Sequence, residues 1–183
     1  MKKLLIGSLV GAILLFGWQS LSWTVFHIHE KAYQYTASQD TLLSAISSTL
    51  KTEGQYMLPR TPPDARYADM EKLGKQMEGK PWAVVTFHSY YPYDMVTPIV
   101  RGFLTAFVCV FLVCLVVMKT GRKSFDSIFT TVLTFGVICF LFVWLNGEGW
   151  FHTSWDVLKG ELIDDLMGWG LTGIWIGWWY SRR

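Results

Sequence analysis

Long runs of apolar residues, separated by stretches that hold most of the charge, dominate the pattern along the chain. Three of them cover residues 4–26, 102–118 and 128–145. An α-helix rises 1.5 Å per residue, so about 20 residues cross the hydrocarbon core of a bilayer. Each run is close to this length, and the pattern therefore predicts three membrane-spanning helices.

A fourth apolar run, from about residue 162 to residue 180, contains Asp164 and Asp165 near its start. Its uncharged part begins at Leu166 and is short for a full crossing. Tilt, local thinning of the bilayer or burial of the acids against other helices would allow it to cross. We therefore expect four spans in all, with the second, third and fourth at about residues 98–118, 127–146 and 161–180.

The segment between the first two spans has a different, mixed pattern. Leucine and isoleucine recur at helical spacing in residues 38–51, and β-branched and aromatic residues fill residues 82–87. Residues 55–58 have the composition of a short strand, and Asp64 is placed to cap a helix that runs to residue 78. The predicted insert is helix–strand–helix–strand, with the strands paired.

The expected fold class is an all-α membrane protein, with four transmembrane helices and a small extracytoplasmic α+β insert between the first and second. Residues 1–29 form the first span and its exit, residues 30–97 the insert, and residues 98–183 a region of three transmembrane helices. An insert of this size buries too little surface to be robust alone. We expect it to lean on the span ends or on a partner.

Orientation follows from lysine and arginine in the short loops, which favour the cytoplasmic side. Three clusters fall on one side of a four-span chain: Lys2 and Lys3; Lys119, Arg122 and Lys123; Arg182 and Arg183. Both termini are then cytoplasmic, and residues 27–97 are extracytoplasmic. The first apolar run is longer than a signal-peptide core, and Ser20-Leu21-Ser22 is a weak cleavage site, so we expect a retained anchor.

Composition agrees with this picture and excludes some functions. Hydrophobic residues make up 51% of the chain and charged residues 16%, against about 25% charged in soluble domains. The net charge of +2 gives no reason to expect a nucleic-acid partner. All three cysteines lie within apolar runs and are expected to act as small hydrophobic residues rather than as disulfide partners.

Histidines form the first candidate site. All four histidines are expected on the extracytoplasmic side: His27, His29, His88 and His152. Glu161 is expected at the same side. Histidine is the commonest metal ligand, and these residues, with Asp164 and Asp165, could complete a zinc, copper or haem site. No HExxH or CxxC spacing supports a metal site. His27 and His29 are two residues apart, so their side chains would diverge on a helix or a strand. The main expectation is therefore interfacial histidines and no cofactor.

A second candidate is an ion pair inside the membrane between Arg101 and the two aspartates, Asp164 and Asp165. Ionisable groups within spans are costly and are usually paired or functional. Arg101 opens the second span and the aspartates open the fourth, at the same face. We expect the pair to pin the two helices at equal depth. A proton or ion pathway is the alternative, although one acidic pair does not make a complete route.

Glycine spacing provides the third candidate, a helix-packing site. Gly7 and Gly11 form a GxxxG motif in the first span, and Gly173 and Gly177 form another in the fourth. Small residues four apart let helix backbones approach closely. We expect the first helix to pack against the last; contact with another subunit is the alternative.

Three features resemble small uncharacterised four-span inner-membrane proteins of bacteria. They are the Met1-Lys2-Lys3 start, Lys80-Pro81-Trp82 before the second strand and Gly168-Trp169-Gly170 in the last span. The resemblance covers the general layout and implies a multi-pass protein of the bacterial inner membrane. It implies no activity and no functional residue.

The expected function follows from what the chain combines. It has GxxxG faces and a small insert, but no GxSxG, Walker A, GxGxxG or zincin motif. We expect no enzyme, but a non-catalytic accessory or scaffold subunit of a membrane complex. Its partners would be the lipid bilayer and other membrane subunits or itself. The alternative is a metal- or cation-binding or transport protein that uses the extracytoplasmic His and Asp/Glu residues.

Overall fold

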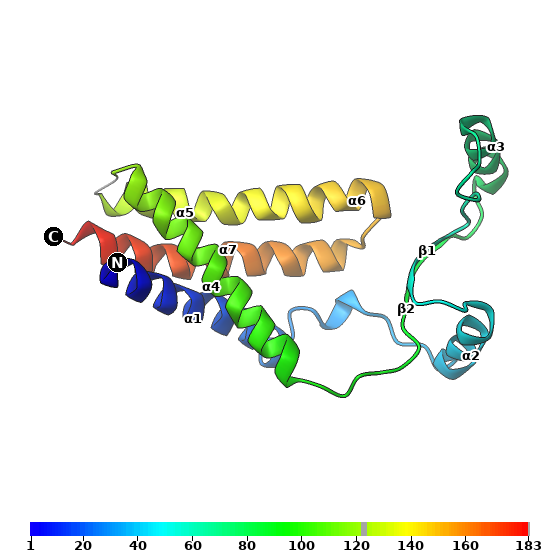
Figure 1. The fold of residues 1–183 in the computed structure, drawn as a ribbon, viewed down its shortest axis with the longest axis horizontal. Helices are drawn as coiled ribbons and strands as arrows, with labels where there is room; N and C mark the ends of the chain where they lie inside the picture. Colours follow the sequence, from blue (N-terminus) through cyan, green and yellow to red (C-terminus); the bar gives the residue numbers. More distant parts are fainter. Residues whose placement is uncertain (122–123, 183) are drawn as a thin grey trace. The chain divides into compact units, whose positions relative to one another are not determined.

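The computed structural model describes residues 1–121 and 124–182, in two compact units (Figure 1). The helical unit comprises Met1–Gln34 and Asp94–Arg183, and the insert unit comprises Tyr35–Tyr93. Three of the basic residues that predict the orientation lie outside the described residues: Arg122, Lys123 and Arg183.

Three helices of the helical unit are long and apolar enough to cross a membrane: α1 (Lys2–Thr24), α4 (Val96–Lys119) and a continuous helix over Phe125–Phe151. The continuous helix consists of α5 (Phe125–Cys139), a π-helical segment η2 (Phe140–Leu145) and α6 (Asn146–Phe151). The chain is thus mostly helical, with the spans of a multi-pass membrane protein. The final helix, α7 (Trp155–Ser181), has 27 residues but is less apolar.

The four long helices pack in the order α4–α1–α7–α5, because α1 contacts both α4 and α7 while α5 packs on the other side of α7. Contacts between α4 and α5 are sparse. Both chain ends lie at one end of the unit, which we call the terminal end, where α1 begins and α7 ends (Figure 1). The opposite end, where α1 ends and α7 begins, is called the insert end. Fully buried apolar side chains come from all four helices: Ala12, Val110, Ile128, Val132 and Ile176.

The third and fourth helices are longer than the sequence pattern predicts. Residues 146–160 were expected to form a loop, but the third helix continues to Phe151 and α7 begins at Trp155. The turn between them needs only a few residues, since His152 adopts a left-handed conformation (φ 47°). Ser154 then caps α7, its Oγ accepting a hydrogen bond from the Val157 N–H at 3.5 Å. The added turns are polar, so apolar pattern alone did not reveal them.

The insert unit has the predicted order: α2 (Gln39–Thr49), β1 (Gly54–Leu58), α3 (Tyr67–Met77) and β2 (Ala83–Phe87). The strands pair antiparallel, with Gly54 opposite Phe87 and Leu58 opposite Ala83, which confirms the predicted strand pair. Asp64 does not cap the second helix. The Asp69 carboxylate does so instead, accepting a hydrogen bond from the Arg66 backbone N–H at 3.2 Å.

One polar contact closes the open end of this hairpin. The Glu53 carboxylate accepts hydrogen bonds from the side chain and the backbone N–H of Ser89, the latter at 2.9 Å. Hydrogen bonds to a carboxylate favour its charged form. The hydrogen bond from the Ser89 side chain has the larger effect and the one from its backbone N–H the smaller, and together they hold the pKa of Glu53 below its usual range.

Candidate functional site

A buried carboxylate lies at the centre of the candidate site, at the insert end of the helical unit. Asp164 projects from α7 toward α1 and is only 6% exposed. The Trp18 indole N–H donates to its Oδ1 at 3.0 Å, and the Ser22 hydroxyl donates to its Oδ2 at 2.8 Å. Trp18 and Ser22 lie four residues apart and so share one face of α1.

A histidine from the segment that follows α1 forms a third hydrogen bond to this aspartate. The His29 Nε2–H donates to Asp164 Oδ2 at 3.0 Å, and its Nδ1 lies 3.9 Å from Glu161 Oε1. The ring is 3% exposed and stacks on Trp23, with centroids 4.1 Å apart and planes 6° apart. We call Trp18, Ser22, His29, Glu161 and Asp164 the His–Asp cluster.

Local backbone geometry brings His29 back onto α7. His27 adopts a left-handed conformation (φ 51°), and the Ile28 N–H donates to the Ser22 carbonyl at 3.1 Å. The imidazole then occupies the space where Gly160 has no side chain. A Cβ at Gly160 would lie 2.7 Å from His29 Nδ1. The cluster therefore depends on a turn after α1 and on a glycine in α7.

The order of groups excludes a Ser–His–Asp hydrolase triad. In a triad, histidine bridges serine and aspartate and removes the serine proton. Here Asp164 bridges Ser22 and His29, and the Ser22 side chain is completely buried. The arrangement instead ties the segment after α1 to α7. Chemically it offers imidazole and carboxylate groups, which can bind a proton or a cation.

Asp165 has a different environment from its neighbour. It lies one turn before Trp169, which packs against Gly136 of α5, so its side chain is on the α5 side of α7. Its Oδ2 is buried and has no hydrogen-bond partner among the described residues. A carboxylate oxygen without a partner in such a place is costly.

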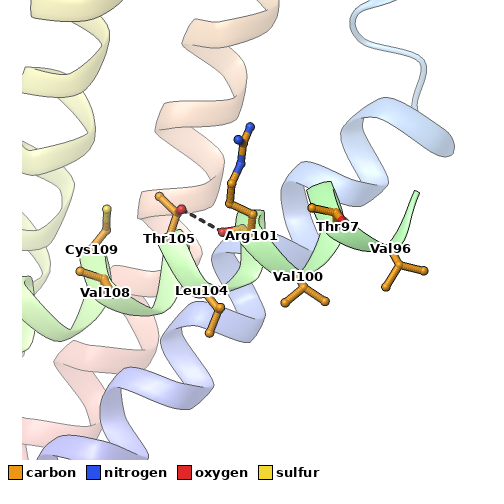
Figure 2. A pocket seen from close by; sticks show the side chains of 8 residues that line it. All are labelled: Val96, Thr97, Val100, Arg101, Leu104, Thr105, Val108 and Cys109. Carbon is orange, nitrogen blue, oxygen red and sulfur yellow. Dashed lines mark hydrogen bonds between the residues drawn. The ribbon is translucent and has the colours of Figure 1, made fainter. Parts of the chain in front are cut away.

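The predicted ion pair of Arg101 with Asp164 and Asp165 is not among the ion pairs of the described residues. No ion pair within residues 1–121 and 124–182 includes Arg101, and Asp164 is bound by α1 and His29 instead. The α4 side chains around Arg101 line a shallow apolar groove of about 610 Å³ (Figure 2). Figure 2 shows the guanidinium projecting away from Val100 and Leu104.

The predicted histidine–Glu161 metal set is only partly brought together. His29 faces Glu161, whereas His88 belongs to the insert unit, and His27 and His152 occupy turns after α1 and α6. Among the described residues, no three His, Cys, Asp or Glu side chains are arranged to hold a metal ion. Metal binding therefore remains a prediction without a preformed ligand set.

The predicted packing glycines receive side chains from neighbouring helices within the chain. A Cβ at Gly7 would meet Trp179 and Tyr180 of α7 at 3.0 Å, while one at Gly11 would meet Val110 of α4 at 2.7 Å. Gly173 and Gly177 instead face Phe129 and Phe125 of α5. Thus α1 does pack against α7, but the second GxxxG faces the third helix rather than the first.

Backbone carbonyl groups of α1 accept hydrogen bonds from a row of α7 side chains, which we call the carbonyl ladder. The Trp179 indole donates to the Lys3 carbonyl at 2.9 Å, and the Trp175 indole donates to the Gly7 carbonyl at 2.9 Å. The Thr172 hydroxyl donates to the Gly11 carbonyl at 3.3 Å. With Trp18 and Ser22 on Asp164, polar contacts join α1 and α7 from one end to the other.

Two features of the site could not be predicted from the sequence: the partners of Asp164 and the carbonyl ladder. The expected partner of the two aspartates was Arg101, while His29 was grouped with the other histidines. Trp23, six residues before His29, gave no sign that it would cover that ring. Trp175 and Trp179 lie within an apolar run, and nothing in the sequence indicates that their indole N–H groups donate to carbonyl groups of α1. No family model matches the chain, and no curated protein or solved structure was found to be similar to it.

Proposed function

We propose that the chain is a four-span protein of a bacterial inner membrane, with both termini cytoplasmic and residues 27–97 outside. The fourth span is α7, which has 27 residues and lies between two apolar helices. Its aspartate at position 164 is supported by three hydrogen-bond donors, which lowers the cost of placing it in the membrane. The basic residues at the terminal end support the orientation.

Within that membrane, the proposed function is that of a non-catalytic accessory or scaffold subunit. The observation that carries it is the exposed face of α4. Val100, Leu104 and Val108 are each at least half exposed on this face, and Arg101 lines the same groove with its guanidinium pointing away from Val100 and Leu104. The cation has no acidic partner in the described part of the chain. An unpaired cation on an apolar helix face suits a partner helix that carries a carboxylate.

Arg101 lies close to the start of α4, where a long side chain can also reach lipid headgroups. The apolar part of the groove does not distinguish lipid from protein. Charge complementarity favours a partner with Asp or Glu at matching depth, and this is the occupant we propose. The exposed insert tyrosines, among them Tyr91 and Tyr93, offer further contact surface outside the membrane.

Site-specific photocrosslinking in native membranes tests this function. A benzophenone amino acid at Leu104 is expected to form a covalent adduct with another polypeptide. The same probe at Ile13, which is exposed on α1, should give no protein adduct. The two side chains are 55% and 52% exposed, so they are matched for access. Arg101→Gln should reduce the adduct at position 104 several-fold.

Three outcomes would contradict the proposal. Lipid adducts alone at both positions would show that the α4 face contacts only the bilayer. An adduct consisting of two copies of this chain would replace the heteromeric complex with self-association. Equal adducts with and without Arg101 would remove the role of the charge.

A second candidate function, binding of a small cation, is favoured by the His–Asp cluster. His29, Glu161 and Asp164 place one imidazole and two carboxylates around a buried point. In the observed geometry His29 and Asp164 bind each other, so a cation would have to separate them. This requirement makes cation binding the weaker candidate.

Calorimetric titration of the full-length chain in detergent with Zn²⁺ tests the second candidate. One equivalent of bound zinc is expected, and His29→Gln should bind zinc at least tenfold more weakly. Replacing a residue that only supports a metal ligand already lowers the affinity by about 10- to 100-fold, and His29 would be a ligand itself. His88→Gln is the control, because that residue belongs to the insert unit and lies outside the cluster. No binding, or equal loss in both variants, would exclude the cluster as a cation site.

A further inference from the structure

We propose that the terminal end of the helical unit binds the phosphate of an acidic phospholipid between Lys3 and Arg182. A cavity of about 470 Å³ is present there, lined by Lys3, Ile6, Trp178, Trp179 and Arg182. This inference goes beyond the proposed subunit function and does not depend on it. It requires only that α1 and α7 lie in a membrane.

Both cationic residues line this cavity, and the contacts of their charged groups are with uncharged groups. The Lys3 ammonium donates to the Arg182 carbonyl at 2.9 Å, and the Arg182 guanidinium lies 3.9 Å from the ring centre of Trp178. Neither takes part in an ion pair among residues 1–121 and 124–182. Two like charges beside one cavity repel each other, and an anion bound between them would remove that repulsion.

The sequence around this end has few acids to serve as the anion. Of the described charged residues at the helix ends here, Lys2, Lys3, Lys119 and Arg182 are basic and Asp126 is acidic. The counterion must therefore come largely from outside the chain. Basic pockets between transmembrane helices are suited to acidic headgroups.

The cavity also provides an apolar surface for the rest of a lipid. Ile6 is 46% exposed and Trp178 is 38% exposed, and both lie beside the cations. The Trp179 N–H is already bound to the Lys3 carbonyl, which fixes the indole as a wall of the cavity. A lipid with its phosphate beside Lys3 and Arg182 and an acyl chain along Ile6 would contact both the basic and the apolar residues that line the cavity. A soluble phosphate would leave the apolar part unused.

Native mass spectrometry of the full chain in neutral detergent tests this site. Phosphatidylglycerol is expected to bind about 10- to 30-fold more tightly than phosphatidylcholine of the same acyl chains, given about one kcal/mol for each of two basic residues. The preference should fall close to unity in the double variant K3Q/R182Q. It should persist in Lys119→Gln, which removes a charge from the same end but not from the cavity.

A charge-preserving variant, K3R/R182K, guards against a simple loss of structure and should retain most of the preference. Glycerol phosphate is the probe for a soluble source and should not displace phosphatidylglycerol at equal concentration. Displacement by glycerol phosphate would overturn the lipid assignment. Equal losses in Lys119→Gln and K3Q/R182Q would show diffuse surface charge instead of a site.

Discussion

Asp164→Asn is expected to lower the free energy of unfolding by about 3 kcal/mol or more, the range for breaking a buried charged hydrogen-bond group. The native carboxylate accepts from Trp18, Ser22 and His29. An amide has one acceptor oxygen, and its NH2 group would face donors that are buried. Unfolding of the full chain in mixed micelles, followed by circular dichroism as denaturing detergent is added, measures the change.

The same substitution one residue later gives a matched control. Asp165→Asn is expected to cause no loss of stability, or a small gain, because the buried Oδ2 of Asp165 has no hydrogen-bond partner in the described part of the chain. Neutralising a carboxylate in that position removes a desolvation cost. Similar losses at positions 164 and 165 would mean that helix α7 is sensitive to any change there, and the role assigned to Asp164 would be wrong.

The second large effect is expected at the close approach of α5 and α7. Gly136→Ala should destabilise the helical unit by about 1–3 kcal/mol, the usual cost of overpacking. The added Cβ would lie 2.7–2.8 Å from Cδ1, Cβ and Cγ of Trp169, whose side chain is 6% exposed. The contact includes the stem of the side chain, so a rotation of the indole alone cannot relieve it.

Gly17→Ala is the control for this prediction. A Cβ at Gly17 has no neighbour within 4 Å, so the substitution should stabilise α1 by up to about 1 kcal/mol through helix propensity. Opposite signs for the two variants in the same unfolding assay are the expected result. Destabilisation by Gly17→Ala of equal size would show that glycine is needed for another reason, and the argument from close approach would fail.

The apolar runs predicted the long helices because hydrophobicity is a local property that the sequence records directly. The positions of α1, α4 and most of α5 follow from it, and the insert hairpin follows from turn residues and β-branched content. The start of α7 was missed because residues 155–161 carry charge. Ser154 followed by Asp156 was a usable signal, since both favour the first turn of a helix.

The candidate site could be predicted only in part, because pairing between distant residues is not a local property. The sequence indicated that Asp164 needs a partner, and charge alone favoured Arg101. The observed partners are donors from α1 and a histidine placed by the left-handed backbone at His27. Glycine spacing indicated close helix packing, but not which helix each glycine would face.

The carbonyl ladder has a consequence for the order of synthesis. Its acceptors at Lys3, Gly7 and Gly11 leave the ribosome well before its donors at Thr172, Trp175 and Trp179. The first helix therefore enters the bilayer long before its main partner exists. Lateral assembly of α1 with α7 waits until these donors have been made, so a nascent chain that stalls before residue 172 leaves an inserted helix without its main partner, which quality-control proteases can recognise.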